Sequence, residues 1–342
     1  MYKISTVAPS DAQGRARVRA LLEKEQIRMD ANLDYTCAIF DETQHAIATG
    51  SCYGNALRCF AVARAHHGEG ILHALLTHLM DVQKERGNDA VFLYTKGATA
   101  PYFQHLGFYE IARANDEIVF FENKSDGFSS YLEKLTKESP VASGTAAAIV
   151  LNANPFTLGH RALVEYAAAK VDLLCLFVVE ENRSLFPTEV RFQLVKEGVK
   201  DLPNVHVFLS GPYMISGNTF PTYFLKAGED AAALQCELDA TLFARCLAPK
   251  LDISVRFVGS EPLDPTTACY NRALREVLPP SGIALDELPR RELGHTPISA
   301  SRVRALLKTK GVCPEVLSLV PPVTGEWLGA HWNELAAPEA SS

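Results

Sequence analysis

Three features are scarce in this sequence of 342 residues, and each absence excludes a class of protein. No apolar run approaches the 18 residues of a membrane-spanning helix, and the first residues lack the apolar segment of a signal peptide. Basic residues are not in excess, since 33 Lys and Arg stand against 40 Asp and Glu, for a formal net charge of −7. We therefore expect a cytoplasmic, globular protein that binds neither nucleic acid nor a membrane.

The cysteines and histidines lack the spacing of a disulfide framework or a metal site. Eight cysteines are spread along the chain without a CxxC pair, and some, such as Cys175, stand within apolar segments where a free thiol is a small core residue. We interpret all eight as reduced and structural, with a catalytic thiol as the minor alternative. His66, His67 and His73 have no nearby set of carboxylates or cysteines, so we interpret them as surface residues and predict no metal ligands.

The sequence divides near residue 140, because residues 139–145 form a small, polar stretch of the kind found in linkers. Upstream, residues 1–138 predict an α+β unit with strands near 37–41, 45–52, 57–63, 90–94, 108–113 and 117–122 and helices near 70–86 and 99–106. Downstream, residues 146–342 predict strands near 147–151, 172–179, 204–209 and 253–258 that alternate with helices near 160–170, 187–200, 267–277 and 300–309, before a helical tail. This alternation predicts a Rossmann-like, doubly wound parallel sheet with ligands at the carboxyl ends of its strands.

The turn after strand 147–151 leads into a helix that begins with Gly159-His160. Asn154-Pro155 predicts a tight turn, and Gly159 lets the helix start lie close to whatever is above the strand. Free backbone N–H groups and the positive end of the helix dipole favour an anion there, and the His160 imidazole can donate a further hydrogen bond to a phosphate oxygen. The alternative is that Asn154-Pro155 is only a turn and His160 a solvated residue at a helix start.

A second helix start, near residue 300, carries a matching set of donors. Ser299 and Ser301 can cap this helix, and Arg304 offers a guanidinium from its first turns. The two segments, Thr157-Leu-Gly159-His160 and Ile298-Ser299-Ala-Ser301-Arg-Val-Arg304, resemble the TxGH and ISxSxxR motifs of the nucleotidylyltransferase superfamily. Rossmann-like members of that superfamily bind ATP by both motifs and direct a nucleophile at the α-phosphorus.

The resemblance implies a set of site residues. His160 and Arg304 would be catalytic. Arg191, on the predicted helix 187–200, could reach the same phosphates or acetate, or could equally be a surface ion-pair partner. The residues implied to bind ATP are Asn152, Asn154, Phe156, Thr157, Gly159, His160, Gly259, Ser260, Glu261, Ile298, Ser299, Ser301 and Arg304.

The N-terminal unit contains a second glycine-containing turn, His67-Gly68-Glu-Gly70, between the strand 57–63 and the helix 70–86. It resembles the acyl-CoA site of GNAT acetyltransferases, and Tyr102 stands in a segment that resembles the later motif of that family, whose Tyr protonates a departing thiolate. The resemblance implies that His67, Gly68, Gly70 and Tyr102 bind a CoA-like thiol arm. The turn is not a dinucleotide fingerprint, because His73 replaces the third glycine of GxGxxG, and the chain has no GxxxxGK[ST] motif.

The order of the two units resembles the citrate (pro-3S)-lyase ligase family over nearly the whole chain. Three further segments carry this resemblance, at residues 184–198, 211–226 and 258–271. It implies an enzyme that uses ATP and Mg²⁺ to convert acetate into acetyl-adenylate and then acetylates the CoA-like prosthetic thiol on the acyl carrier subunit of citrate lyase. Three alternatives stay open: a nucleotidylyltransferase that acts on a phosphorylated cofactor precursor, a GNAT N-acetyltransferase with a nucleotide-sensing domain, and a non-enzymatic scaffold that binds a carrier protein.

Overall fold

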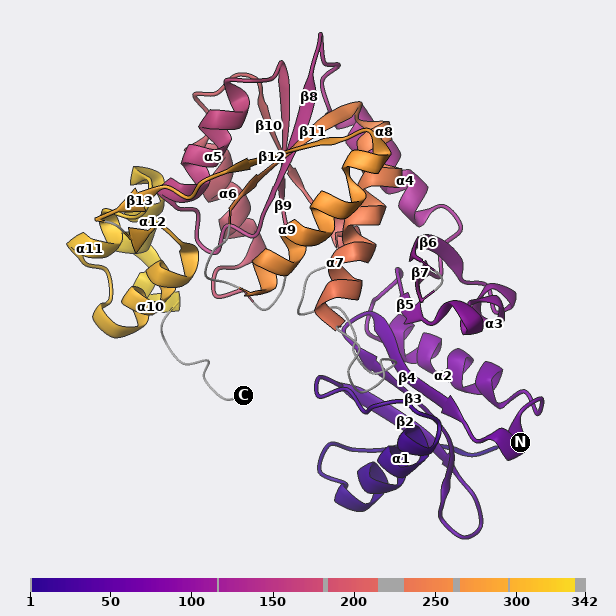
Figure 1. Ribbon diagram of the computed structural model, residues 1–342. Coiled ribbons are helices and arrows are strands. Elements are labelled where there is room, and N and C mark those ends of the chain that lie inside the picture. The colour runs from indigo at the N-terminus through magenta and orange to yellow at the C-terminus, as the bar shows by residue number, and fades with distance from the viewer. Residues whose placement is uncertain are drawn as a thin grey trace. The chain divides into compact units, whose positions relative to one another are not determined.

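The computed structural model describes residues 2–115, 117–180, 184–214, 231–260, 265–294 and 296–335 (Figure 1). These residues divide into two compact units. The first unit holds residues up to Ser130 together with 231–238, and the second holds 131–214 and 239–335. In the described part of the chain, no helix combines the length and the hydropathy that a membrane span requires.

The described part of the first unit contains a seven-stranded mixed sheet in the order β1-β2-β3-β4-β5-β7-β6. Its strands are β1 (Ile4–Thr6), β2 (Tyr35–Phe40), β3 (Ala46–Tyr53), β4 (Ala56–Val62), β5 (Phe92–Thr95), β6 (Tyr109–Ala114) and β7 (Ile118–Glu122). Neighbouring strands are antiparallel except β4 and β5, which are parallel and pair only at Ala56–Phe92 and Leu57–Leu93. The two strands therefore separate toward the end of β4, where the glycine-containing turn begins.

Helices complete this unit. They are α1 (Ala12–Lys24), α2 (Ile71–Glu85) and α3 (Ala100–His105), with the short 3₁₀ turns η1 (Arg64–His66) and η2 (Gly97–Thr99); α4 (Gly127–Glu138) follows along the chain. The α2 helix buries Ile71, Leu75 and Leu79 on one stripe against β3 and β4, as its apolar periodicity predicts. The α+β arrangement that the sequence predicted is confirmed.

The second unit contains a parallel sheet of five described strands in the order β10-β9-β8-β11-β12. Its strands are β8 (Ala146–Leu151), β9 (Leu173–Val178), β10 (Val205–Leu209), β11 (Ile253–Gly259) and β12 (Ala284–Leu288). Ala147, Ala148 and Ile149 are fully buried, as expected for a continuous apolar strand that is covered on both faces. The strand order reverses direction at β8, so a ligand crevice is expected beyond the carboxyl ends of β8 and β11.

The second unit also contains helices. They are α5 (Leu158–Ala168), α6 (Thr188–Gly198), α8 (Ala248–Lys250), α9 (Pro265–Val277), α10 (Ala300–Lys310), α11 (Pro314–Leu317) and α12 (Pro322–Leu335). Of these, α10, α11 and α12 form a cluster with its own apolar core (Figure 1). The short helical segments are η3 (Gly211–Tyr213), η4 (Phe243–Leu247) and η5 (Pro279–Ser281), and β13 (Glu292–Leu293) and β14 (Thr296–Pro297) form a small hairpin. The α7 helix (Ala231–Leu242) is divided between the units, because residues 231–238 belong to the first and 239–242 to the second. The α5 helix packs on β8, β9 and β11, and α6 packs on β9 and β10. The predicted Rossmann-like parallel sheet is confirmed.

The sequence did not predict every element. Its strand list omitted β12, whose residues Ala-Leu-Asp-Glu-Leu are half polar and half-exposed because this strand lies at the edge of the sheet. It also omitted α1, whose 13 residues include five charged ones that leave only a short apolar stripe. Residues 139–145, the proposed linker, contain neither helix nor strand, and Val141 among them is 97% exposed.

Candidate active site

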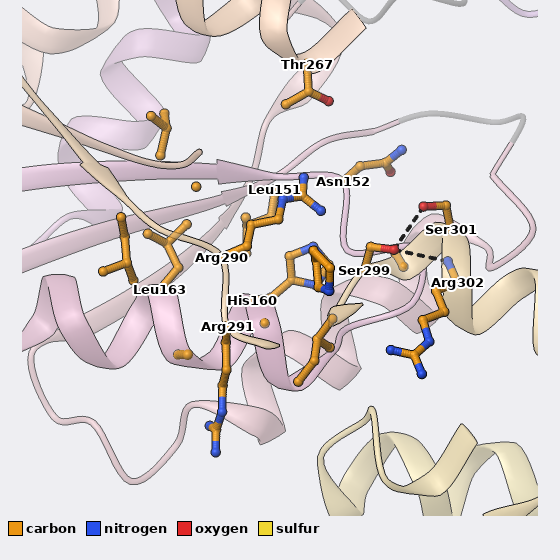
Figure 2. Close-up of a pocket in the computed structure, with 18 of the residues that line it drawn as sticks. Leu151, Asn152, His160, Leu163, Thr267, Arg290, Arg291, Ser299, Ser301 and Arg302 are labelled. Atoms are coloured by element: carbon orange, nitrogen blue, oxygen red, sulfur yellow. Dashed lines mark hydrogen bonds between the residues drawn. The ribbon is translucent and has the colours of Figure 1, made fainter. Parts of the chain in front are cut away.

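A cavity of about 800 Å³ lies at the carboxyl ends of β8, β11 and β12 in the second unit. The starts of α5 and α10 form part of its wall, and Figure 2 shows His160, Asn152 and Ser299 grouped beside the end of β8 at Leu151. Segments 157–160 and 298–304, which the sequence analysis predicted to bind phosphate, and the nearby strand ends contribute Asn152, Gly159, His160, Gly259, Ile298, Ser299, Ser301 and Arg304 to its lining. The topology thus brings two segments that are distant in sequence to one cavity of a size typical for a small-molecule site.

The start of α5 fixes the orientation of His160. Thr157 is the N-cap of this helix, and its hydroxyl accepts a hydrogen bond from the His160 backbone N–H. The His160 Nδ1 atom in turn accepts a hydrogen bond from the Thr157 backbone N–H over 3.1 Å. Because Nδ1 is an acceptor, the neutral imidazole carries its proton on Nε2. Phe156, fully buried, stacks against the imidazole at 5.9 Å between ring centroids.

Gly159 allows the two motifs to approach each other. A Cβ atom at this position would lie only 2.7 Å from the backbone oxygen of Ile298, which is closer than real Cβ contacts. The start of α5 therefore packs directly against the segment that precedes α10, and only glycine fits between them. This close approach holds both helix N-termini at the same cavity.

The start of α10 presents a second set of donors. Ser299 is its N-cap and accepts a hydrogen bond from the Arg302 backbone N–H, and the Ser299 and Ser301 hydroxyls are 3.1 Å apart (Figure 2). Arg304 lies one turn further and donates from Nη1 to the backbone oxygen of Asn154, 2.5 Å away. The Arg304 guanidinium is thereby held next to the turn that leads into α5.

Arginines make the cavity strongly cationic. Arg256, Arg290, Arg291, Arg302 and Arg304 line it, and none of its described lining residues is Asp or Glu. Arg290 donates from Nε to the backbone oxygen of Ser260, whereas the side chain of Arg291 points away from His160 in Figure 2. An anion is the ligand that such a wall favours.

Burial and, to a smaller extent, nearby positive charges keep His160 neutral. Burial, followed by the positive charges of Arg290 and Arg304, lowers the pKa of His160 from 6.5 to about 4. At neutral pH the imidazole is therefore uncharged, with the Nε2–H group as its only free donor. A neutral donor of this kind can hydrogen-bond a phosphate oxygen without adding a charge that must be desolvated.

We expect the imidazole of His160 to titrate below pH 5 in the free protein, as measured by NMR of its labelled ring. Between pH 6.5 and 4 the unfolded chain binds a proton at this residue and the folded chain does not, so the free energy of unfolding falls as the pH falls through this window. The melting temperature should fall less between pH 7 and pH 5 in His160→Gln than in the wild-type protein. A measured pKa near 6.5 would contradict the proposed environment.

Of the five arginines that line the cavity, only Arg304 was predicted from the sequence as a site residue. The pair Arg290-Arg291 is separated only by Pro289 from the end of β12, and because this strand was not predicted, their place near a strand end was hidden. The paired arginines a few residues before Ile298 were the available signal. Arg256 stands inside a predicted strand, and no neighbouring motif indicated that it would line a cavity.

Several predicted residues lie behind the cavity wall instead of on it. The Asn154 amide oxygen accepts from the Phe186 backbone N–H, which fastens the turn after β8, and Phe156 and Thr157 are buried beneath it. Ser260 follows Gly259, and its backbone N–H donates a hydrogen bond to the backbone oxygen of Leu288. Glu261 lies outside the described residues.

Arg191 is not a surface residue, which corrects one of the two interpretations of it. It is fully buried, and its guanidinium donates to the backbone oxygens of Asn152, Phe186 and Val179. Its Nη2 donates to the Thr188 hydroxyl. These contacts tie α6 to the ends of β8 and β9, and Arg191 is not among the residues that line the cavity.

The glycine-containing turn of the first unit has its own geometry. Gly68 and Gly70 adopt positive φ values of 86° and 74°, and Gly70 caps the start of α2. His67 donates from Nε2 to the Val62 backbone oxygen, while Glu69 accepts hydrogen bonds from Tyr2 and His66. Tyr102, on α3, is 63% exposed.

The cysteines and histidines that the structure describes form no cluster suited to a metal. In the ranges that the structure describes, no group of three His, Cys, Asp or Glu side chains is placed to hold an ion. The eight cysteines are free thiols, and burial raises the pKa of Cys37 and Cys59 to about 12. Such thiols are protonated and poor nucleophiles.

Comparison with known proteins places these features in context. Residues 146–328 match the family model of the citrate lyase ligase C-terminal domain. The [citrate [pro-3S]-lyase] ligase of Klebsiella pneumoniae is 38% identical over 322 residues, which cover 93% of each chain. The enzyme of the same name from Escherichia coli K12 is 36% identical over 94% of this chain and 92% of its own.

Two solved structures are similar to part of this chain. A GNAT-family acetyltransferase from Staphylococcus aureus Mu50 is 17% identical, covers 36% of this chain and 100% of its own, and has a TM-score of 0.31. Escherichia coli ElaA is 11% identical, with the same coverage of both chains and a TM-score of 0.31.

Proposed function

The chain belongs to the citrate lyase ligase family, and on that premise we propose that it activates acetate with ATP and acetylates the acyl carrier subunit of citrate lyase. AMP and diphosphate are the other products. The observation that best supports the chemistry is the meeting of two helix N-termini, His160 and several arginines at one cavity of about 800 Å³. A cavity with many donors and no described carboxylate suits a triphosphate.

The residues of the cavity fit the charge of ATP. We assign the triphosphate to the N-termini of α5 and α10, with the Nε2–H of His160, the Ser299 and Ser301 hydroxyls and the Arg304 guanidinium as its donors. Gly259, at the end of β11, would lie beside the adenosine. The described wall offers no carboxylate to hold Mg²⁺, so this ion would enter with ATP and would supply neutralisation of phosphate charge.

The reaction has two steps. A carboxylate oxygen of acetate attacks the α-phosphorus, the bond from that phosphorus to the bridging oxygen breaks, and diphosphate leaves with its electrons; no proton is transferred. The thiolate of the prosthetic group then attacks the carbonyl carbon of acetyl-adenylate, and AMP leaves. In both steps the protein acts chiefly by stabilising phosphoryl charge, since the chemistry otherwise needs only alignment.

We assign the two steps to different parts of the chain. Residues 146–342 would carry the adenylation, and residues 1–138 would hold the CoA-like arm, with 139–145 as the linker. The turn at His67, Gly68 and Gly70 and the exposed Tyr102 are the candidate contacts of the arm. Glu69 places a negative charge in this turn, which disfavours a free diphosphate group there more than it disfavours the uncharged pantetheine portion of an arm.

The test of the proposed function is acetate-dependent exchange of labelled diphosphate into ATP by the full-length protein. The ligase requires exchange that depends on acetate. Exchange that depends on a phosphorylated substrate would support a nucleotidylyltransferase instead, and consumption of acetyl-CoA without ATP would support an N-acetyltransferase.

Substitution of Gly70 by Trp should separate the two steps. No described atom outside the neighbouring residues lies within 4 Å of where a Cβ atom at position 70 would be. The indole can therefore project into the turn where we place the arm. We expect the KM for the carrier thiol to rise about tenfold or more, which corresponds to about 1.4 kcal/mol, while acetate-dependent exchange stays close to wild type. Steady-state acetylation of the carrier and the exchange assay provide the two readouts.

Gly70→Ala is the matched control, because it imposes the same strain at positive φ without the bulk of the indole. It should retain most of the acetylation activity. Loss of both exchange and acetylation in a folded Gly70→Trp protein would contradict the division of labour.

A further inference from the structure

Arg256 occupies an unusual position for a charged residue. It stands in the middle of β11, is 1% exposed, and lines the same cavity as the two phosphate motifs. Strand alternation places it on the same face as Val258, whereas Phe257 between them packs into the apolar core on the other face. The Cζ atom of Arg256 lies 4.4 Å from the centroid of the Phe243 ring.

The hydrogen-bonding needs of Arg256 are not met by the protein. Its Nε and Nη1 atoms are closed off from solvent and have no hydrogen-bond partner, and it forms no ion pair within 4.0 Å with the carboxylates the structure describes. The nearby carboxylate of Asp239 contributes a favourable charge but accepts a 2.5 Å hydrogen bond from the Tyr270 hydroxyl. A buried cation with unused donors is costly unless an anion reaches it.

We propose that Arg256 binds the carboxylate of acetate at the inner end of the cavity. This inference rests on the proposed function. Arg256 already lines the cavity, so rotation about its side-chain bonds can turn the unused donors toward a ligand there. The ion pair would leave one carboxylate oxygen available to attack the α-phosphorus.

The surroundings of Arg256 favour a small carboxylate over a phosphate of ATP. Val150 and Val258 line this part of the wall with the ring of Tyr270, and Phe243 lies against the guanidinium. These apolar groups suit the methyl group of acetate and offer no further donors to a phosphate. The phosphate donors stand instead at the starts of α5 and α10, on His160, Ser299, Ser301 and Arg304.

The test measures the exchange reaction of the full-length protein in two series, one that varies acetate at saturating ATP and one that varies ATP at saturating acetate. For Arg256→Met we expect the KM for acetate to rise about 10- to 100-fold, the effect of losing hydrogen bonds to a charged group. The KM for ATP should change less than about twofold. The KM for acetate of Arg256→Lys should lie between those of the wild type and Arg256→Met, because lysine keeps the charge but lacks the planar donors.

Arg245→Met is the matched control, because Arg245 is exposed on the neighbouring segment η4 and does not line the cavity. It removes the same charge and should keep the wild-type KM for acetate. Melting temperatures report folding, and Arg256→Met should melt at or above the wild-type temperature because it removes a buried cation without an acceptor. If Arg256→Met fails to fold, Arg256→Lys decides the test by the same two KM values.

The outcomes separate this proposal from the proposed function. Absence of acetate-dependent exchange in the wild-type protein would overturn the proposed function. Normal exchange in the wild type, with an unchanged KM for acetate in the folded Arg256 variants, would overturn the role of Arg256 alone. A raised KM for ATP with an unchanged KM for acetate would overturn it in favour of a contact between Arg256 and the nucleotide.

Discussion

Replacement of His160 by alanine is expected to lower the rate of acetate-dependent exchange by about a hundredfold or more while the protein stays folded. The imidazole presents one Nε2–H donor to the cavity, held in place by the hydrogen bond from the Thr157 backbone N–H to Nδ1. Loss of one well-placed donor to developing phosphoryl charge typically costs about 3 kcal/mol of transition-state stabilisation. Exchange rates at saturating acetate and ATP measure the effect.

The fold should tolerate this change. Thr157 still caps α5 through the backbone N–H of residue 160, and the alanine removes only the reciprocal contact of the capping box. His331→Ala is a suitable control, because His331 is an exposed histidine on α12 of the same unit. Near-normal exchange in a folded His160→Ala protein would contradict the assignment of His160 to the phosphates.

The sequence was most informative where local structure alone decides position. The order of strand, turn and helix around Gly159-His160, and the helix start at Ser299, follow from apolar runs, turn residues and capping residues. Because parallel strands end at one edge of a sheet, two such motifs at strand ends had to meet there. Their meeting at one cavity could therefore be predicted.

The remaining parts of the site depend on tertiary packing. Arg191 stands on an amphipathic helix and looks from its sequence like a surface residue, yet its guanidinium serves three backbone oxygens at the ends of β8 and β9. Arg290 owes its place to β12, a strand that is polar enough to escape detection by periodicity. Arg256 is buried by Phe243, which comes from a different segment. Burial and hydrogen bonds of this kind are set by residues far apart in sequence.

The structure also explains why the two phosphate motifs should act as one unit. The Arg304 guanidinium donates to the backbone oxygen of Asn154, and Gly159 packs against the backbone oxygen of Ile298. Each motif is therefore positioned partly by the other. In addition, Arg304 helps to keep the His160 imidazole neutral by lowering its pKa. Residues that position one another in this way are not independent contributors to catalysis.

Substitution of Arg304 by alanine is expected to reduce exchange at least as strongly as the change at His160, by about a hundredfold or more, because it removes both a phosphate donor and the contact to the Asn154 backbone oxygen. Arg304→Lys separates charge from shape. The lysine ammonium keeps the positive charge near His160, but it cannot hold the Asn154 oxygen and a phosphate oxygen with one rigid planar group. We therefore expect only partial recovery, with a rate between those of the alanine variant and the wild type. Recovery of the full wild-type rate in Arg304→Lys would show that the charge alone matters, and that the planar geometry of the guanidinium does not contribute to the adenylation step.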